Sequence, residues 1–287
     1  MISTFFTILI ASTAAQNVQP DRISSADLKG ELLGLSIYED HAIVSISENS
    51  TFHYKNMSSN VTFTEPEMFY PGRGALLFTS AGPTYTVNGR KGEIVKFTSN
   101  GNSAATKDFR LSQGFITDMY QAGDRLYASS FNYTNGAPLT TIWRFKEDEF
   151  KEWFTVDGLI TKFVLGKSRK VFYGIKHNED EEVSKELIKI SVSSKCRDPP
   201  PTTQLVKHIS IDPIHDTIAR DADDNIYLPS QDNAVSIINS DLELKVAFNS
   251  SVQVTQLAVS EKNLYVGGHC YAPDYDYSEI CLASYKL

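Results

Sequence analysis

Residues 221–230, DADDNIYLPS, place a polar turn directly before a β-branched and aromatic run, and this combination recurs along the chain. The other copies are EDHAIVSI (39–46), GRGALLFTS (72–80), AGDRLYASS (122–130), KSRKVFYGI (167–175) and SEKNLYVGG (260–268). The apolar runs are spaced by roughly 44 residues on average, which is typical of the blades of a β-propeller. The fold is therefore expected to be repetitive.

Each copy lies between two further strand-like segments, such as GFITDMY before and TTIWRF after the copy at 122–130. The pattern is strand, turn, strand, loop, strand, with almost no helical periodicity. A unit of this kind cannot bury both of its faces alone, so neighbouring units must pack around an axis. We predict an all-β fold, a six-bladed β-propeller in one domain over 16–287, with its ring closed by an N-terminal strand around residues 21–28.

Composition and charge exclude several classes of protein. The chain has 287 residues, of which 41% are apolar and 22% charged, and its formal net charge is −8. This charge disfavours binding to nucleic acid, which needs clustered Lys and Arg. After the N-terminus, no stretch approaches the roughly 20 apolar residues of a membrane span. We therefore expect no nucleic-acid partner and no membrane span.

The N-terminus and the sequons predict secretion. Residues 1–15, MISTFFTILIASTAA, resemble a signal peptide with small residues at the cleavage site, although the basic segment is missing and a buried strand is the alternative. Glycosylation sequons begin at Asn49, Asn56, Asn60, Asn132 and Asn249. Glycans on the first units would obstruct an extensive interface there, so we expect a monomer.

The chain has three cysteines. Cys270 and Cys281 bracket the loop YAPDYDYSEI, and each flanks an apolar strand, so a disulfide across a hairpin is predicted. Cys196 is left over, either buried or as a free thiol. Three cysteines are too few for a disulfide scaffold.

No local motif identifies an enzyme. The sequence has neither an HExxH nor a GxSxG motif. Asp221–Asn225 resembles the start of a calcium loop, but Ile226 stands where that loop needs glycine, so a polar β-turn is the better interpretation. Better candidates are polar residues where innermost strands meet a shared cavity: 117–119, 161–163, 215–217 and 255–257. The alternative is that they bind water or neighbouring strands.

The segment HDTIARDADDNIYLPSQDNAVSII (215–238) resembles the SMP-30/gluconolactonase group of propellers, with Asp216 and Asp221 at the two aspartates of its motif. The resemblance implies a divalent metal on Asp216. However, Thr161, followed by Lys162, falls at the position of a second ligand, an asparagine. A hydroxyl beside an ammonium is a poor site for a hard dication. Metal-dependent lactone hydrolysis is therefore disfavoured, and no metal is expected.

A closer resemblance is to the fungal secreted branch of these propellers, which includes hetero-Diels–Alderases. It rests on FITDMYQAGDRLYASS (115–130), NIYLPSQDNAVSII (225–238) and NLYVGG (263–268), within similarity over most of residues 30–287. The resemblance implies an enzyme without metal or organic cofactor that holds two reactive partners in near-attack geometry.

The same resemblance implies roles for individual residues. Asp118, Asp216 and His215 are the catalytic candidates, which would position or protonate a substrate. A carboxylate desolvated in such a cavity would have a raised pKa and act as a general acid. The candidates for substrate binding are Thr117, Phe115, Thr161, Phe163 and Gln256, with the two phenylalanines as an apolar wall.

Several functions remain open at this stage, because propellers host them all. The favoured one is a secreted, cofactor-free cyclase of natural-product biosynthesis that acts on a small molecule. The main alternative is a secreted propeller that binds a small ligand without converting it, similar to the yellow-like proteins. A metal-dependent lactonase and a protein-interaction propeller are the remaining alternatives.

Overall fold

The computed structural model describes residues 22–29, 31–38, 41–48, 51–56, 62–64, 71–78, 84–88, 93–97, 107–110, 114–122, 125–147, 149–168, 170–177, 185–193, 203–211, 215–230, 233–270 and 279–287. Side chains are described chiefly from residue 114 onward. Among these residues, no helix is long and apolar enough to cross a bilayer.

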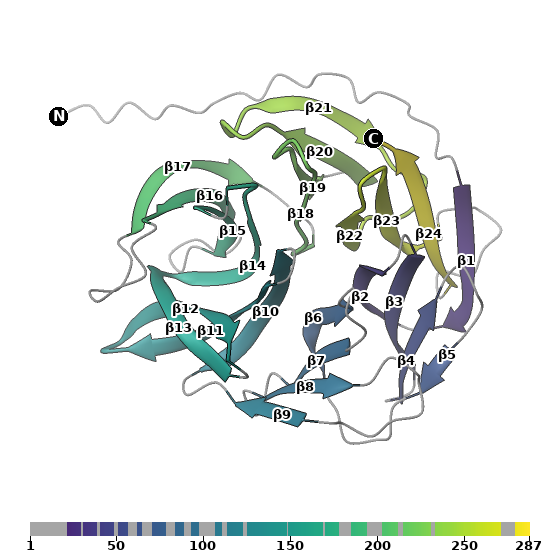
Figure 1. Cartoon of the computed structure of the whole chain (residues 1–287). Coiled ribbons are helices and arrows are strands. Elements are labelled where there is room, and N and C mark those ends of the chain that lie inside the picture. The colour runs from purple at the N-terminus through teal and green to yellow at the C-terminus, as the bar shows by residue number, and fades with distance from the viewer. Residues whose placement is uncertain are drawn as a thin grey trace.

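The described strands form six antiparallel sheets of four strands each (Figure 1). In chain order, the first sheet contains β2 (Glu31–Tyr38), β3 (His41–Glu48), β4 (Thr51–Asn56) and β5 (Thr62–Thr64). The second sheet contains β6 (Pro71–Phe78), β7 (Thr84–Asn88), β8 (Glu93–Phe97) and β9 (Lys107–Arg110). The third sheet contains β10 (Phe115–Ala122), β11 (Arg125–Thr134), β12 (Ala137–Lys146) and β13 (Glu149–Asp157). The fourth sheet contains β14 (Leu159–Leu165), β15 (Val171–His177), β16 (Lys185–Val192) and β17 (Thr203–Ile211). The fifth sheet contains β18 (Ala219–Arg220), β19 (Ile226–Ser230), β20 (Ala234–Ile238) and β21 (Leu244–Asn249). The sixth sheet contains β22 (Gln256–Val259), β23 (Asn263–His269), β24 (Glu279–Lys286) and β1 (Arg22–Lys29).

The sheets are arranged around a centre, with the first strand of each sheet innermost (Figure 1). These inner strands contact one another: β2 contacts β6 and β22, β10 contacts β6 and β14, and β18 contacts β22. The molecule is therefore an all-β propeller.

The prediction of a six-bladed propeller needs correction, because it was based on a repeating unit with too few strands. The sequence repeat contains three strands, whereas every sheet of the structure has four. The repeat missed the outer strand because most outer strands lack a continuous apolar run. In β13, for example, EFKEWFTVD buries only Phe154 fully. We therefore describe the fold as a propeller of four-stranded sheets.

In five sheets the recurring apolar run occupies the second strand, between two neighbouring sheets, whereas GRGALLFTS (72–80) coincides with β6, the first strand of its sheet. In β15, Phe172 and Tyr173 are both almost completely buried, yet they belong to different hydrophobic clusters. Successive residues of a strand face opposite sides, so Phe172 packs with Phe154 of β13 and Tyr173 packs with Ile226 of β19. Burial on both faces explains why these runs are continuous rather than alternating.

The last sheet joins the two ends of the chain. β1 pairs antiparallel with β24, where the sequence places the closing strand. The predicted disulfide is present between Cys270, which follows β23, and Cys281 of β24. Cys281 also pairs with Gly268 of β23 and Ser25 of β1.

The sequons fall at different places in the fold. Asn56 ends β4, Asn249 ends β21 with an exposed side chain, and Asn132 is half-buried in β11 beside the exposed Tyr133 and Thr134. The proposed signal peptide at 1–15, Asn49, Asn60 and Cys196 lie outside the described residues.

Candidate functional site

Polar side chains from the fourth, fifth and sixth sheets gather at the end of the propeller where the inner strands begin. We call them the inner-strand cluster: Thr161 of β14, His177 of β15, Lys185 of β16, His215 and Asp216 before β18, and His269 of β23. His177 pairs with Leu159 at the start of β14, and Thr161 directly follows the Ile160–Lys176 pair, so both lie at this end of their sheet.

Asp216 is the best-connected member of the cluster. Its Oδ2 lies 3.0 Å from Nε2 of His177, and its Oδ1 lies 2.8 Å from Nζ of Lys185. Burial raises the pKa of Asp216, but the hydrogen bonds from His177 and Lys185 outweigh burial and hold this pKa well below its ordinary value. Asp216 is therefore a carboxylate at neutral pH, which reverses the expected general-acid role.

His177 and Thr161 do not form a nucleophilic triad with Asp216. Oγ1 of Thr161 lies 3.3 Å from the same Nε2 of His177 that contacts Asp216. A Ser-His-Asp triad uses the two different ring nitrogens of its histidine, one for the nucleophile and one for the carboxylate. Here a single N–H is shared between two oxygen acceptors, so the arrangement holds Asp216 in place rather than activating Thr161.

His215 and His269 each have a buried ring nitrogen that is available for a hydrogen bond. Nε2 of His215 and Nδ1 of His269 are both buried, and neither has a hydrogen-bond partner among the described residues. Burial lowers the pKa of His215, the Lys185 ammonium lowers it further, and Asp216 opposes both. His215 is therefore a neutral imidazole at pH 7.

β-Bulges aim two of the predicted site residues. The β10–β11 register shifts between Ile116 and Asp118, and the β14–β15 register shifts between Ile160 and Lys162. Thr117 and Thr161 are thus the extra residues of equivalent bulges, which commonly redirect a side chain near a functional site. Thr161 faces His177, whereas Oγ1 of Thr117 lies 2.7 Å from Oγ of Ser129.

Asp118 links two neighbouring inner strands. Its Oδ1 lies 2.9 Å from Nζ of Lys162, and its Oδ2 accepts a hydrogen bond from the backbone N–H of Phe163 at 3.1 Å. Burial raises the pKa of Asp118, as the sequence predicts, while Lys162 opposes the rise. Thr217 makes the corresponding link to the last sheet, because its Oγ1 accepts from the N–H of Leu257. Both oxygens of Asp118 are thus occupied, and its catalytic role stays a prediction.

The remaining predicted site residues have different surroundings. Phe163 was expected to form a pocket wall, but this is corrected by its burial: it is 1% exposed and stacks on Phe172 in the core, with ring centroids 5.4 Å apart. Gln256 is half-buried as the first residue of β22. Phe115 begins β10, and its side chain is not described.

Sequence reasoning missed His177, Lys185 and His269. Each lies at the end or the start of a second or third strand, not on an innermost strand. His177 and His269 both end the second strand of their sheet, and this equivalence within the repeat is the signal that could have identified them.

The donor set does not fit the divalent metal that the sequence resemblance implies at Asp216. Both carboxylate oxygens already contact cationic or N–H donors, namely Lys185 and His177. Thr161 offers only a hydroxyl, and the ammonium of Lys162 follows it. Among the described side chains, no three His, Cys, Asp or Glu residues are placed to hold a metal ion.

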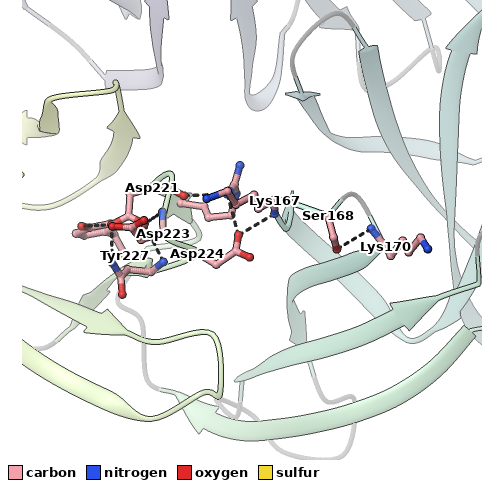
Figure 2. A network of polar contacts seen from close by, with 9 residues as sticks. Lys167, Ser168, Lys170, Asp221, Asp223, Asp224 and Tyr227 are labelled. Atoms are coloured by element: carbon pink, nitrogen blue, oxygen red, sulfur yellow. Dashed lines mark hydrogen bonds and ion pairs between the residues drawn. The ribbon is translucent and has the colours of Figure 1, made fainter.

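The acidic turn at 221–225 lies at the opposite ends of the inner strands and is confirmed as a structural turn. Asp221 accepts hydrogen bonds from the backbone N–H groups of Asp223 and Asn225 and from the side chains of Asn225 and Tyr227 (Figure 2). Oδ1 of Asp224 accepts from Arg220 and from the backbone N–H of Lys167, at 2.8 Å each. The turn thus connects the fifth sheet to the fourth, and the carboxylates of Asp221 and Asp224 are already engaged.

A separate cavity of about 500 Å³ lies between β13 and the face of the β14–β17 sheet. Its lining includes Asp157, Lys176, Glu186, Ile188 and Leu205. Lys176 and Glu186 directly adjoin His177 and Lys185 in the chain, and neighbours in a strand face opposite sides. The fourth sheet therefore separates this cavity from the inner-strand cluster.

Comparisons with known proteins establish the fold. No protein-family model matches the chain, and no curated protein matches it. Among solved structures, a gluconolactonase from Xanthomonas campestris matches with a TM-score of 0.65 at 11% identity, over 92% of this chain and 89% of that one. A luciferin-regenerating enzyme matches with a TM-score of 0.63 at 13% identity, over 92% and 95%. Virginiamycin B lyase from Staphylococcus aureus matches with a TM-score of 0.53 at 8% identity, over 92% and 99%. At these identities the likeness shows the propeller fold alone.

Proposed function

We propose that the protein is a secreted enzyme that binds a small molecule at the inner-strand cluster and converts it without a metal or organic cofactor. The observation that carries the proposal is the fixed Asp216 carboxylate, held by His177 and Lys185 beside a neutral imidazole, His215. Perturbed titratable groups gathered on several strands are typical of functional sites.

The cluster suits a reaction driven by positioning and polarisation. Asp216 is locked in its charged form, so it supplies a fixed negative charge rather than a proton. His215 is neutral and can hydrogen-bond to a substrate oxygen or take up a proton. A ring-forming reaction between two parts of a bound molecule needs alignment and hydrogen bonding but no redox step. The cyclase type is therefore our proposal for the reaction.

Two further features support secretion. The Cys270–Cys281 disulfide is stable in an oxidising compartment. Residues 1–15 have the apolar stretch and small residues of a signal peptide, and the exposed Asn249 lies in a sequon. Mass spectrometry of the secreted protein checks this part, with an N-terminus after Ala15 and glycan mass on Asn249 as the expected result.

The function is tested with two substrate panels, each run once with EDTA and once with added Ca²⁺ or Zn²⁺. One panel contains diene–alkene molecules able to close a ring, and the other contains δ-lactones. Product formation is followed by mass spectrometry for the wild type, Asp216→Asn and Lys207→Ala. Lys207 is an exposed residue of β17 and serves as the matched control.

Accelerated ring closure that is lost in Asp216→Asn and kept in Lys207→Ala supports the proposal. Saturable binding with unchanged recovery of every molecule would instead make the protein a binder. Lactone hydrolysis that requires added Ca²⁺ or Zn²⁺ and depends on Asp216 would overturn the cofactor-free reaction.

A further inference from the structure

His215 and His269 reach the same end of the propeller from different elements. His215 precedes β18, and His269 is the last residue of β23 in the next sheet along the chain. The two rings are close enough that the charge of one affects the titration of the other. They are the members of the inner-strand cluster whose buried ring nitrogens have no partner among the described residues.

The position of His269 is set by close backbone packing. The preceding Gly268 leaves no room for a Cβ, because a Cβ there would overlap the backbone oxygen of Gln253. The carbonyl of His269 accepts a hydrogen bond from the N–H of Gln253 at 3.1 Å. The backbone of His269 is therefore held against the segment that enters β22, which fixes the point from which the imidazole extends.

Leaving two imidazole nitrogens unpaired inside the protein is costly. A buried donor or acceptor without a partner loses its hydrogen bonds to water without gaining others in return. Neither nitrogen is exposed to bulk solvent, and a ligand enclosed within the fold could pair with both. Such exceptions commonly mark a catalytic or ligand-binding role.

We propose that His215 and His269 together bind the polar end of a neutral hydroxy-carbonyl molecule. An imidazole ring nitrogen presents either an N–H donor or a lone pair, depending on the tautomer. A carbonyl oxygen accepts from one ring, and a hydroxyl donates to the other. This inference rests on the proposed function, because it names the ligand class of the same site.

The charges around the two rings select a neutral ligand. Asp216 next to His215 repels an anion, and Lys185, which acts on the same ring, repels a cation. The two charges are paired at 2.8 Å, so together they leave little net charge for a ligand ion. A neutral molecule avoids the cost of burying an additional charge.

The proposal is tested by nitrogen NMR on the full-length protein labelled with ¹⁵N-histidine. The probes are hydroxyacetone and 2-hydroxyacetophenone, and the comparison compounds are acetone, lactate and ethanolamine. We expect saturable shifts of His215 Nε2 and His269 Nδ1 with the two hydroxy-ketones and much weaker responses to the others. His53→Leu, on β4 of another sheet, controls for the loss of a histidine.

Amide substitutions separate a hydrogen bond from a packing effect. A Gln amide can occupy the position of Nε2, and an Asn amide that of Nδ1. His215→Gln and His269→Asn should therefore keep the affinity for the hydroxy-ketones within about 2-fold. His215→Leu and His269→Leu should lower it about 3- to 10-fold each, the range of one hydrogen bond. The swapped amides, His215→Asn and His269→Gln, should behave like the leucine variants.

The outcomes distinguish this inference from the function on which it rests. Shifts of His177 without shifts of His215 and His269 would overturn the histidine pair while leaving a ligand site at Asp216. Equal binding of lactate or ethanolamine would overturn the neutral class. Binding of no probe anywhere in the cluster would contradict both the pair and the proposed small-molecule site. Leucine variants that bind as tightly as the wild type would also overturn the pair.

Discussion

Asp118 and Asp216 both lie on or next to inner strands, in the third and fifth sheets, yet their surroundings move their pKa values in opposite directions. Asp118 is almost fully buried and has one ammonium partner, and burial dominates. Asp216 is half-buried and receives hydrogen bonds from both Lys185 and His177, and these bonds dominate. Both carboxyls receive donors, so the extent of burial, rather than the residue type or the number of donors, decides which one is held in its charged form.

The titration of His215 predicts a loss of stability in mild acid. Its folded pKa lies below the ordinary 6.5, so the unfolded chain takes up the proton first as the pH falls. The contribution of His215 is therefore fully present above about pH 6.5 and is lost as the pH falls through its folded pKa. In His215→Gln this loss is absent. Chemical unfolding at pH 7.5, 6.5, 5.5 and 5.0 measures the difference in unfolding free energy between the two proteins.

We expect that difference to move in favour of His215→Gln as the pH falls. Asp216 does not contribute in this window, because a depressed carboxyl pKa acts only below its unfolded value of about 3.9. Asp118, whose pKa is raised, has the opposite effect on the unfolding free energy. This effect cancels when the unfolding free energy of the variant is subtracted from that of the wild type. A difference that stays flat from pH 7.5 to 5.0 would contradict the assignment.

The sequence identifies individual residue types on the inner strands but not their partners. Asp216 and His215 were found because the repeat places them at the start of an inner strand. His177, which binds Asp216, is 39 residues away in the chain and in another sheet. The position of a side chain along a strand follows from a local pattern, whereas a contact between sheets depends on the packing of the complete ring.

At the scale of elements, bulges and links to the next sheet occur near the starts of several inner strands. Thr117 and Thr161 are the bulged residues of β10 and β14. Asp118 and Thr217 each accept a backbone N–H from the following inner strand. Polar residues at these positions therefore serve the fold as well as a ligand, which is the alternative that the sequence left open. A repeat pattern cannot separate the two uses, because both need a polar side chain in the same place.

The Asp118–Lys162 pair predicts strong coupling between β10 and β14. Removing one partner leaves the other charge buried and should destabilise the protein by about 3–5 kcal/mol. The double variant Asp118→Leu/Lys162→Met should recover much of this loss. Urea unfolding of the two single variants and the double variant gives the coupling energy. Single variants that cost less than about 1 kcal/mol would show that the pair does not hold the strands together.

The activity of the same double variant shows whether Asp118 only links β10 to β14 or also takes part in catalysis. If Asp118 only links the strands, the stable double variant should keep most of the activity that Asp216→Asn loses. A double variant that is stable but inactive would instead assign Asp118 to the chemistry, as the sequence resemblance implies.

For the whole molecule, closure of the ring controls whether the site persists. The last sheet takes three strands from the C-terminal part and β1 from residues 22–29. His269 and the Cys270–Cys281 disulfide belong to this sheet. The sequence predicted the closing strand around residues 21–28, and it predicted the disulfide because the two cysteines flank one loop. It missed the outer strands elsewhere, because their side chains do not alternate clearly.

A chain that begins at Glu31 tests the closure. Deleting β1 removes its hydrogen-bonded ladder with β24 and leaves β24 as an open edge, which promotes association between molecules. With net hydrogen-bond contributions of about 0.5–1.5 kcal/mol each, we expect a loss of roughly 3 kcal/mol or more. This corresponds to a fall in Tm of about 6–12 °C. A chain that begins at Gln16 should unfold at the same temperature as the longer protein.

A peptide that supplies the missing strand completes the test. A synthetic peptide of residues 20–30 can pair with the free edge of β24 by strand addition, in the register Arg22–Ser284 to Ala26–Ile280. Its addition should restore most of the lost Tm, and a peptide of the same composition in scrambled order should not. The disulfide keeps β23 and β24 joined in the truncated chain, so the edge remains available for pairing. A truncated chain with unchanged Tm would show that β1 does not close the propeller, and a rescue by both peptides would show that the pairing has no defined register.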